Sequence, residues 1–191
     1  MNIPLFPLNT VLYPGGPLPL RIFEPRYLDM VSDSMKKDKP IGVILIKSGD
    51  EVGSTPEIYD TGTLAEVIYW HKRNDGLLGI TLQGKQRFKV LGTQVNSAKL
   101  MSADIEVIEN LVPLESTDEN SHLKPILEKI LDQLDPPFKT IERHLDNIEW
   151  VSARLMELLP TELSAKQALL ESNNIEERLA KIESILRDSK H

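Results

Sequence analysis

The first 27 residues constrain the fold of this chain more than any other segment, because they hold six of its 13 prolines among apolar residues. Proline cannot donate the backbone hydrogen bond that a central strand requires, so this composition predicts short edge strands joined by tight turns. We expect strands at residues 3–6 and 18–22, with a turn over the sequence P-G-G-P at residues 14–17. Pro25 predicts the start of a helix, since proline at the first helical position loses no hydrogen bond.

Strand-like segments continue through the first half of the chain. Residues 41–46 form a β-branched apolar run that predicts a buried strand, and a polar loop follows at 47–60. The sequence N-D-G at residues 74–76 predicts a hairpin turn. Further strands are predicted by the patterns at 63–70, 77–82, 86–90 and 103–108. Six or seven short strands with close turns favour a small closed barrel or paired sheets.

The apolar period changes in the second half of the chain. The segment 113–121 is polar and acidic, which predicts a boundary between a β-rich part at 1–112 and a helical part at 120–191. Apolar residues then recur every three or four positions in successive segments, so we expect a compact helical bundle. Helix caps are predicted at Asp146 with Glu149, at Thr161, and at Asn174 with Glu177.

Several motifs resemble those of the Lon substrate-binding domain family. The similarity is strongest over residues 4–92 and looser over the helical part, and it covers nearly the whole chain. The motifs are P-L-F-P-L from Pro4, Y-P-G-G-P-L-P-L from Tyr13, I-F-E-P-R-Y from Ile22, G-T-L-A-E from Gly62, D-G at residues 75–76 and G-K-Q-R-F-K-V from Gly84.

This resemblance implies a fold and a role. The fold would be α+β, with a small PUA-like β-barrel of six or seven short, mostly antiparallel strands and one early helix, followed by a C-terminal helical bundle. In the Lon family this module precedes an ATPase and a serine–lysine protease, and it helps to select unfolded or tagged polypeptides. Because 191 residues committed to barrel and bundle leave no room for those domains, the resemblance implies a free-standing recognition module.

Composition and charge restrict the classes of partner. The chain has no cysteine, which excludes disulfides and thiolate chemistry and fits a reducing cytoplasm. Its net charge is −7, and residues 1–110 carry 12 basic against 13 acidic side chains. Neither half offers the basic surface that nucleic acids select, so we expect no nucleic-acid partner. With no targeting signal and no apolar run of about 20 residues, we expect a soluble cytoplasmic protein without a membrane partner.

Four patterns that could carry chemistry have simpler structural interpretations. Residues 79–85 match the spacing of a phosphate-binding loop, but Gln86 replaces the required Ser or Thr, so turn glycines at strand ends are favoured. Ser34 and Lys37 lie one helical turn apart, as in some serine hydrolases, without a partner motif. The four histidines lack metal-ligand spacing, and the acidic cluster at 115–119 lacks a calcium-loop pattern. We therefore expect no catalytic residue, cofactor or metal.

The segment Phe23-Glu24-Pro25-Arg26-Tyr27 is the first candidate polypeptide-binding site. Glu24 and Arg26 could contact a bound chain while Phe23 or Tyr27 fills a pocket. The interpretation that we favour is structural: Glu24 and Arg26 fix the strand-to-helix corner, and Tyr27 packs beneath it.

The second candidate site is the neighbouring pair Tyr69 and Trp70 on a predicted strand. Adjacent side chains of a strand point to opposite faces of the sheet. We therefore expect one of the two in the core and the other outside, where an aromatic side chain is a good anchor for a partner.

Together these features predict a non-catalytic protein-binding module that captures unfolded or extended polypeptides through an apolar groove. An adaptor role in bacterial protein quality control, with a separate ATP-dependent protease as a partner, is implied by the resemblance. Two alternatives stay open. One is a small cytosolic hydrolase with a dispersed Ser/His/Asp site, for which His71 and His144 are available. The other is an RNA-binding PUA-like domain, against which the acidic charge argues.

Overall fold

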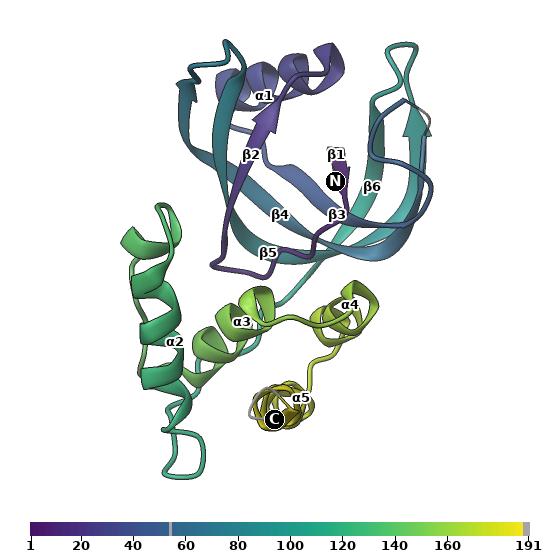
Figure 1. Ribbon diagram of the computed structural model, residues 1–191. Coiled ribbons are helices and arrows are strands. Elements are labelled where there is room, and N and C mark those ends of the chain that lie inside the picture. Colours follow the sequence, from purple (N-terminus) through teal and green to yellow (C-terminus); the bar gives the residue numbers. More distant parts are fainter. Residues whose placement is uncertain (54, 189–191) are drawn as a thin grey trace. The chain divides into compact units, whose positions relative to one another are not determined.

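The computed structural model describes residues 1–53 and 55–188, which divide into two compact units, Met1–Asn110 and Leu111–His191. The first unit contains β1 (Asn2–Leu8), β2 (Pro17–Ile22), α1 (Pro25–Lys37), β3 (Ile41–Ser48), β4 (Glu57–Lys72), β5 (Leu78–Val95) and β6 (Met101–Ile108) (Figure 1). The second contains α2 (Leu123–Gln133), η1 (Phe138–Thr140), α3 (Ile148–Leu158), α4 (Leu163–Glu171) and α5 (Ile175–Asp188). The predicted α+β class is confirmed, and the helix predicted at Pro25 begins there.

The strands of the first unit close into a ring. Their order is β2-β5-β4-β3-β1-β6, and an additional pairing joins β5 to β6. Five strands therefore form a closed barrel, with β2 added beside β5, and we call residues 1–110 the barrel unit. All strand pairs are antiparallel except β1 with β3. Closure removes the free edges that an open sheet would leave on these five strands.

Strands β4 and β5 are longer than the sequence predicted, at 16 and 18 residues. The segments expected as two strands at 77–82 and 86–90 form one continuous strand, and Gly79 and Gly84 lie within it rather than at strand ends. The turn between β1 and β2 packs against the backbone of Gly84. Its N–H donates to the Gly16 carbonyl at 2.9 Å, and its carbonyl accepts from the Gly15 N–H at 2.8 Å. The reason for a glycine here is therefore a close backbone approach, not a chain reversal.

Strand β1 is flanked on both sides, so the prediction of an edge strand for residues 3–6 was wrong. Residues 2–4 pair with β6, and residues 5–8 pair with β3. Each half of the strand has a ladder partner on one side only, so a proline nitrogen can face the unpaired side. The two partners lie far along the sequence, and proline content alone does not reveal them.

Strand β2 is an edge strand, as predicted, and the backbone nitrogens of its prolines face the side that has no partner strand. In the turn between β4 and β5, the Arg73 N–H donates to the Leu77 carbonyl at 2.9 Å. Backbone hydrogen bonds of antiparallel strands alternate in direction from residue to residue. When this alternation is followed along the register, the even-numbered residues of β2 form the hydrogen bonds to β5. The backbone nitrogens of Pro17 and Pro19 therefore face outward, away from β5. These prolines therefore remove no hydrogen bond between β2 and β5. On the outer edge of β2 they leave few N–H groups with which another strand could pair.

Helix α1 covers one end of the barrel (Figure 1). Its buried residues Tyr27, Met30 and Val31 join an apolar cluster built from β1 to β5. A second cluster fills the rest of the barrel around the fully buried Phe88. Because α1 follows β2 closely in the sequence, the first turn of α1 lies at the end of the barrel where β2 ends.

The helical unit is built from amphipathic helices. Helix α2 contributes three buried leucines at helical spacing, and α2 and α5 each pack against α3. The Arg178 guanidinium of α5 donates to the Glu149 carboxylate of α3 at 3.2 Å and to the Ser152 hydroxyl at 3.3 Å. Among the described residues, no helix combines the length and apolarity needed to cross a membrane.

The helix caps differ in part from the prediction. Asn147, not Asp146, caps α3, because its side-chain oxygen accepts from the first N–H groups of the helix. Asp146 instead forms an exposed ion pair with Lys124 at 2.7 Å. Helix α4 has Glu162, not Thr161, at its N-cap position. The predicted cap at the start of α5 is confirmed for Asn174, whose side chain accepts from the Glu176 N–H, but not for Glu177, whose carboxylate accepts from the Ser172 hydroxyl instead.

Alanine at Gly84 tests whether close backbone approach explains this glycine. A Cβ there would lie 2.4 Å from the Tyr13 carbonyl oxygen, whereas a Cβ at Gly92 in the same strand would meet nothing within 4 Å. We expect Gly84→Ala to lower the free energy of unfolding by about 1–3 kcal/mol. Gly92→Ala, the matched control, should be neutral or stabilising by about 0.5–1 kcal/mol. Urea titration measures both, and equal midpoints for the two variants would contradict this explanation.

Candidate functional site

The first turn of α1 is fixed by the guanidinium of Arg26. Its Nη2 forms an ion pair with the Glu24 carboxylate at 3.0 Å, and the two side chains are only 7% and 18% exposed. Its Nη1 donates to the Lys99 carbonyl in the β5–β6 turn at 2.8 Å, and its Nη2 donates to the Glu51 carbonyl in the β3–β4 loop at 3.3 Å. One side chain thus joins the helix start to two distant loops.

Tyr27 packs beneath this corner. Its ring stacks on Phe6 with ring centroids 4.3 Å apart, and the Arg26 guanidinium lies 4.6 Å from the Tyr27 ring centroid. Burial raises the pKa of the Tyr27 phenol above its ordinary value, and the charge of Arg26 opposes that rise. The phenol is therefore neutral at physiological pH and serves as part of the apolar core.

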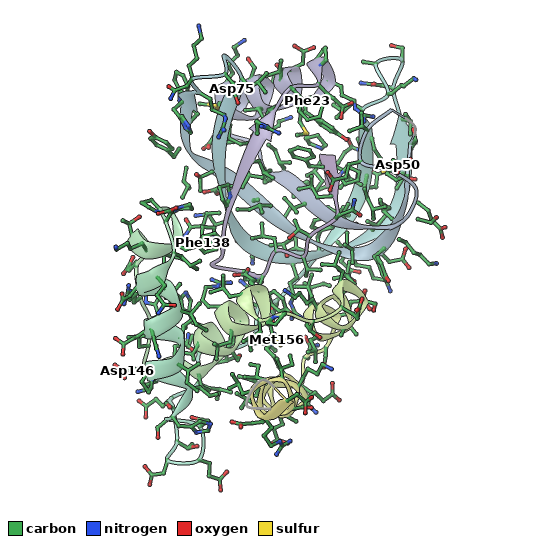
Figure 2. All side chains as sticks on the ribbon, in the orientation of Figure 1. Phe23, Asp50, Asp75, Phe138, Asp146 and Met156 are labelled. Carbon is green, nitrogen blue, oxygen red and sulfur yellow. The ribbon has the colours of Figure 1, made fainter. Side chains whose placement is uncertain are left out.

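A small hollow of about 90 Å³ lies against this corner, and we call it the small hollow. Its lining includes the buried apolar residues Phe6, Leu8 and Ile22. Two further apolar lining side chains, Phe23 and Val52, are 52% and 54% exposed. Figure 2 labels Phe23 near the start of α1. The volume is well below the about 300–1,000 Å³ typical of small-molecule sites, so it suits a single side chain. The lining residues are Phe6, Pro7, Leu8, Leu20, Arg21, Ile22, Phe23, Glu24, Tyr27, Glu51 and Val52.

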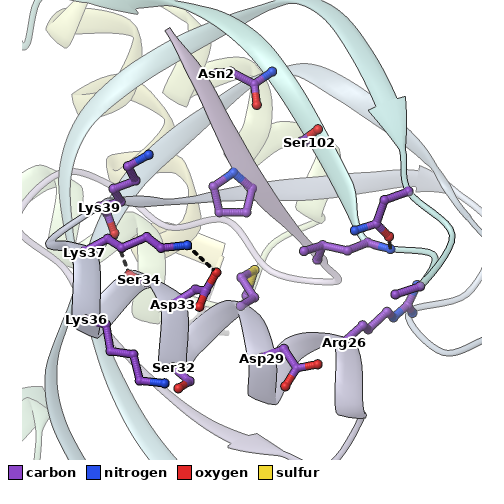
Figure 3. Close-up of a pocket in the computed structure, with 15 residues that line it drawn as sticks. Asn2, Arg26, Asp29, Ser32, Asp33, Ser34, Lys36, Lys37, Lys39 and Ser102 are labelled. Atoms are coloured by element: carbon purple, nitrogen blue, oxygen red, sulfur yellow. Dashed lines mark hydrogen bonds and ion pairs between the residues drawn. The ribbon is translucent and has the colours of Figure 1, made fainter.

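A larger hollow of about 590 Å³ lies between α1, β1 and the β5–β6 turn (Figure 3). In Figure 3 the lysines near the end of α1 lie at one end of it, and Arg26 lies at the other. The Lys37 ammonium is paired with Asp33 at 2.7 Å. The lining residues are Asn2, Pro4, Arg26, Asp29, Met30, Ser32, Asp33, Ser34, Lys36, Lys37, Lys39, Asn96, Ala98, Leu100 and Ser102.

Arg26 holds a wall of each hollow. The turn that it contacts through Lys99 carries three residues that line the larger hollow, and Glu51, which it also contacts, lines the small hollow beside Val52. The shapes of both hollows therefore depend on the same guanidinium.

Tyr69 and Trp70 lie on the part of β4 that leads to the turn with β5. Both side chains are 58% exposed, so the expectation that one of them enters the core was wrong. From Glu66 onward β4 has no buried residue, whereas its partners Ile80 and Leu82 on β5 are buried in an apolar cluster of the barrel. Near the turn both faces of β4 therefore meet solvent, while one face of β5 packs into the core.

The predicted binding residues are thus divided among three places. Phe23, Glu24 and Tyr27 line the small hollow, and Arg26 lines the larger one. The hairpin pair is separate, but it is not remote. Trp70 pairs with a residue of β5 that in turn pairs with Leu20, a lining residue of the small hollow. Two strand spacings correspond to about 10 Å.

The sequence did not reveal the other wall of the small hollow. Val52 is an apolar residue in a polar, glycine-containing loop, which is the one signal that could have marked it. Lys99 and Glu51 hold Arg26 through their backbone carbonyls. A residue that acts through its backbone carbonyl cannot be recognised from the type of its side chain.

The residues considered for catalysis have structural contacts. The Ser34 hydroxyl donates to the Lys39 carbonyl behind the end of α1. His71 stacks on Tyr69, His122 pairs with Glu183 at 2.6 Å, and His144 packs edge-on against Trp150. Within residues 1–53 and 55–188, no three His, Asp or Glu side chains are grouped so that they could hold a metal ion.

A third hollow of about 490 Å³ lies in the helical unit, beside the start of α3. Its polar side chains have structural partners. Asn147 caps α3, and Asp146 pairs with Lys124. Arg143 pairs with Asp132 at 2.6 Å. This hollow therefore offers little free chemistry for a ligand.

Comparison with known proteins gives one consistent family. A family model described as the ATP-dependent protease La (LON) substrate-binding domain matches residues 2–188. The Lon protease of Parabacteroides distasonis is 30% identical over 195 residues, which cover 97% of this chain and 24% of that protein. The Lon protease of Flavobacterium johnsoniae is 28% identical over 191 residues, which cover 93% and 23%. The chain spans about a quarter of the length of the curated relatives it matches.

Solved structures agree with this family. The Lon N-terminal domain protein from Xanthomonas campestris is 33% identical, with a TM-score of 0.76 over 96% of this chain and 98% of that chain. The N-terminal domain of the Mycobacterium avium complex Lon protease has a TM-score of 0.65 at 16% identity, covering 98% and 99% of the two chains. At that identity the second comparison supports the fold alone.

Replacing Arg26 tests the corner. Arg26→Gln removes the charge and leaves the poorly exposed Glu24 carboxylate without its partner, so we expect a loss of about 2–4 kcal/mol in the free energy of unfolding. Arg21→Gln is the matched control, because Arg21 is more than half exposed and lies 3.9 Å from the Asp75 carboxylate. It should cost less than about 0.5 kcal/mol. Chemical denaturation measures both, and a loss for Arg26→Gln no larger than that of the control would refute a structural role.

Proposed function

The chain belongs to the substrate-binding domain family of ATP-dependent protease La (LON), and we propose that it binds unfolded or extended polypeptides through the barrel unit. It makes this contact without catalysing a reaction, as an adaptor of protein quality control in the bacterial cytoplasm. A separate ATP-dependent protease is the partner that would receive the bound polypeptide.

The observation that carries this proposal is the small hollow. It has buried apolar residues in its lining, room for one side chain, and two half-exposed apolar lining side chains, Phe23 and Val52. Each Å² of apolar surface that is removed from water contributes about 25 cal/mol of favourable free energy. An apolar side chain of a bound polypeptide that fills the small hollow would therefore contribute to the affinity. A folded protein keeps such side chains inside, whereas an unfolded chain presents them to a partner.

The proposed roles of the six binding residues differ. Phe23 contacts the bound chain directly, while Glu24 and Tyr27 shape the hollow behind it. Arg26 positions both walls and acts through them. Tyr69 and Trp70 form a second contact on the hairpin, where exposed aromatic side chains are good anchors.

The family supports a polypeptide as the ligand. Its description names a substrate-binding domain of a protease, and the curated relatives cited above carry the name Lon protease. Their proteolytic activity is a property of those longer proteins. What we transfer to this chain is the recognition of the polypeptide.

The small hollow can be tested by removing its exposed apolar side chains. We expect Phe23→Ser with Val52→Ser to weaken binding of a reduced, carboxymethylated unfolded protein by about thirtyfold, because about 1 kcal/mol of apolar contact is lost at each position. Fluorescence anisotropy of the labelled unfolded protein measures the dissociation constant. Since both side chains are exposed, the thermal midpoint of the variant should change little.

The matched control is Leu91→Ser with Val107→Ser. These side chains are also exposed, on β5 and β6, and neither lines the small hollow. The control should bind the unfolded protein as the native chain does. Equal weakening by both double variants, or equal binding of the same protein in its folded form, would contradict the proposal.

A further inference from the structure

One face of the hairpin carries an ordered aromatic surface. Directly paired residues of antiparallel strands project to the same face of a sheet. Arg21 and His71 both pair with Gly79, and Pro19 and Tyr69 both pair with Thr81. These side chains therefore share one face, opposite to the face that packs into the core through Leu82 and Ile80. We call Pro19, Arg21, Tyr69 and His71 the hairpin platform.

Gly79 keeps the platform flat. A Cβ at this position would lie 2.4 Å from the His71 ring, so the imidazole rests directly on the backbone of β5. His71 also stacks on Tyr69, with ring centroids 5.4 Å apart and an interplanar angle of 30°. The two exposed rings therefore form a continuous surface on which a further planar or apolar group can stack.

The platform is bordered by positive charge. Arg21 and Arg73 share a single carboxylate, Asp75, at 3.9 and 3.2 Å. Two guanidinium groups therefore stand against one carboxylate on this face, in a chain whose net charge is −7. This local excess favours an anionic partner.

We infer that the hairpin platform binds acidic segments of an extended polypeptide, with an aromatic side chain of that segment stacked on Tyr69 and His71. The inference rests on the proposed function and specifies the class of sequence that is recognised. Arg21 belongs to the platform and also lines the small hollow, so one extended chain can contact both. A polypeptide is favoured over a nucleic acid because the barrel unit as a whole lacks the positive charge that a phosphate backbone requires.

Three labelled decapeptides with one phenylalanine test the charge preference by fluorescence anisotropy. They carry four aspartates, four asparagines or four lysines at the same positions. We expect the aspartate peptide to bind about three- to tenfold more tightly than the asparagine peptide in 50 mM salt, and less than about twofold more tightly in 500 mM salt. The lysine peptide should bind most weakly.

Two variants localise the effect. Gly79→Ala displaces the His71 ring, a flexible side chain, and should weaken the aspartate peptide several-fold with little change in thermal midpoint. Gly92→Ala in the same strand, with open space around its Cβ, is the matched control and should leave binding unchanged. Arg21→Gln with Arg73→Gln should abolish the preference for aspartate over asparagine while the asparagine peptide still binds.

The possible failures are distinguishable. If the asparagine peptide binds and the aspartate peptide binds no better, the charge preference is refuted and the proposed function stands. If no peptide and no unfolded protein binds, both are refuted. A single-stranded oligonucleotide of ten nucleotides that binds more tightly than the aspartate peptide would overturn the choice of a polypeptide.

Discussion

The guanidinium of Arg26 is the interaction on which the candidate site depends. It joins the first turn of α1 to two loops that are 25 and 73 residues away in the sequence. Each loop forms part of a different hollow, so neither wall is held by its own local structure. The planar group suits this task because it donates in several directions while its charge stays paired with Glu24. The favoured sequence interpretation, that Glu24 and Arg26 fix the corner, is compatible with this geometry, and the same geometry places both residues at the walls of candidate binding surfaces.

The prolines of the opening determine how this barrel can meet another chain. An extended polypeptide commonly binds by adding a strand to a free sheet edge, where its backbone pairs with exposed N–H and C=O groups. Here Pro17 and Pro19 face outward on the edge strand β2 and offer no N–H. In the proposed function, recognition near this edge would therefore use side chains: the apolar residues that line the small hollow and the rings of the hairpin platform. Side-chain recognition is also consistent with binding many different unfolded sequences.

Local features were predictable from the sequence, and features created by closure of the barrel were not. Pro25 marks a helix start through its own geometry, and Asn174 caps a helix through its own side chain. By contrast, β1 lies between two strands because β6 returns to it about 100 residues later. The aromatic residues of the candidate site could be singled out by type, but the exposure of both Tyr69 and Trp70 could not, because it depends on which strand of the hairpin supplies the buried side chains, and here that strand is β5.

The separation of the two contact areas defines the conformation that a bound chain must have. Arg21 and His71 are two strand spacings apart, or about 10 Å, and Arg21 already borders the small hollow. An extended chain covers this distance with about three residues, whereas a helix needs about seven. Because the small hollow holds one side chain, its contact alone is weak, and a second contact on the same chain adds affinity by raising the effective concentration. Under the proposed function, an extended segment with an apolar residue a few positions from an aromatic one would therefore gain both contacts.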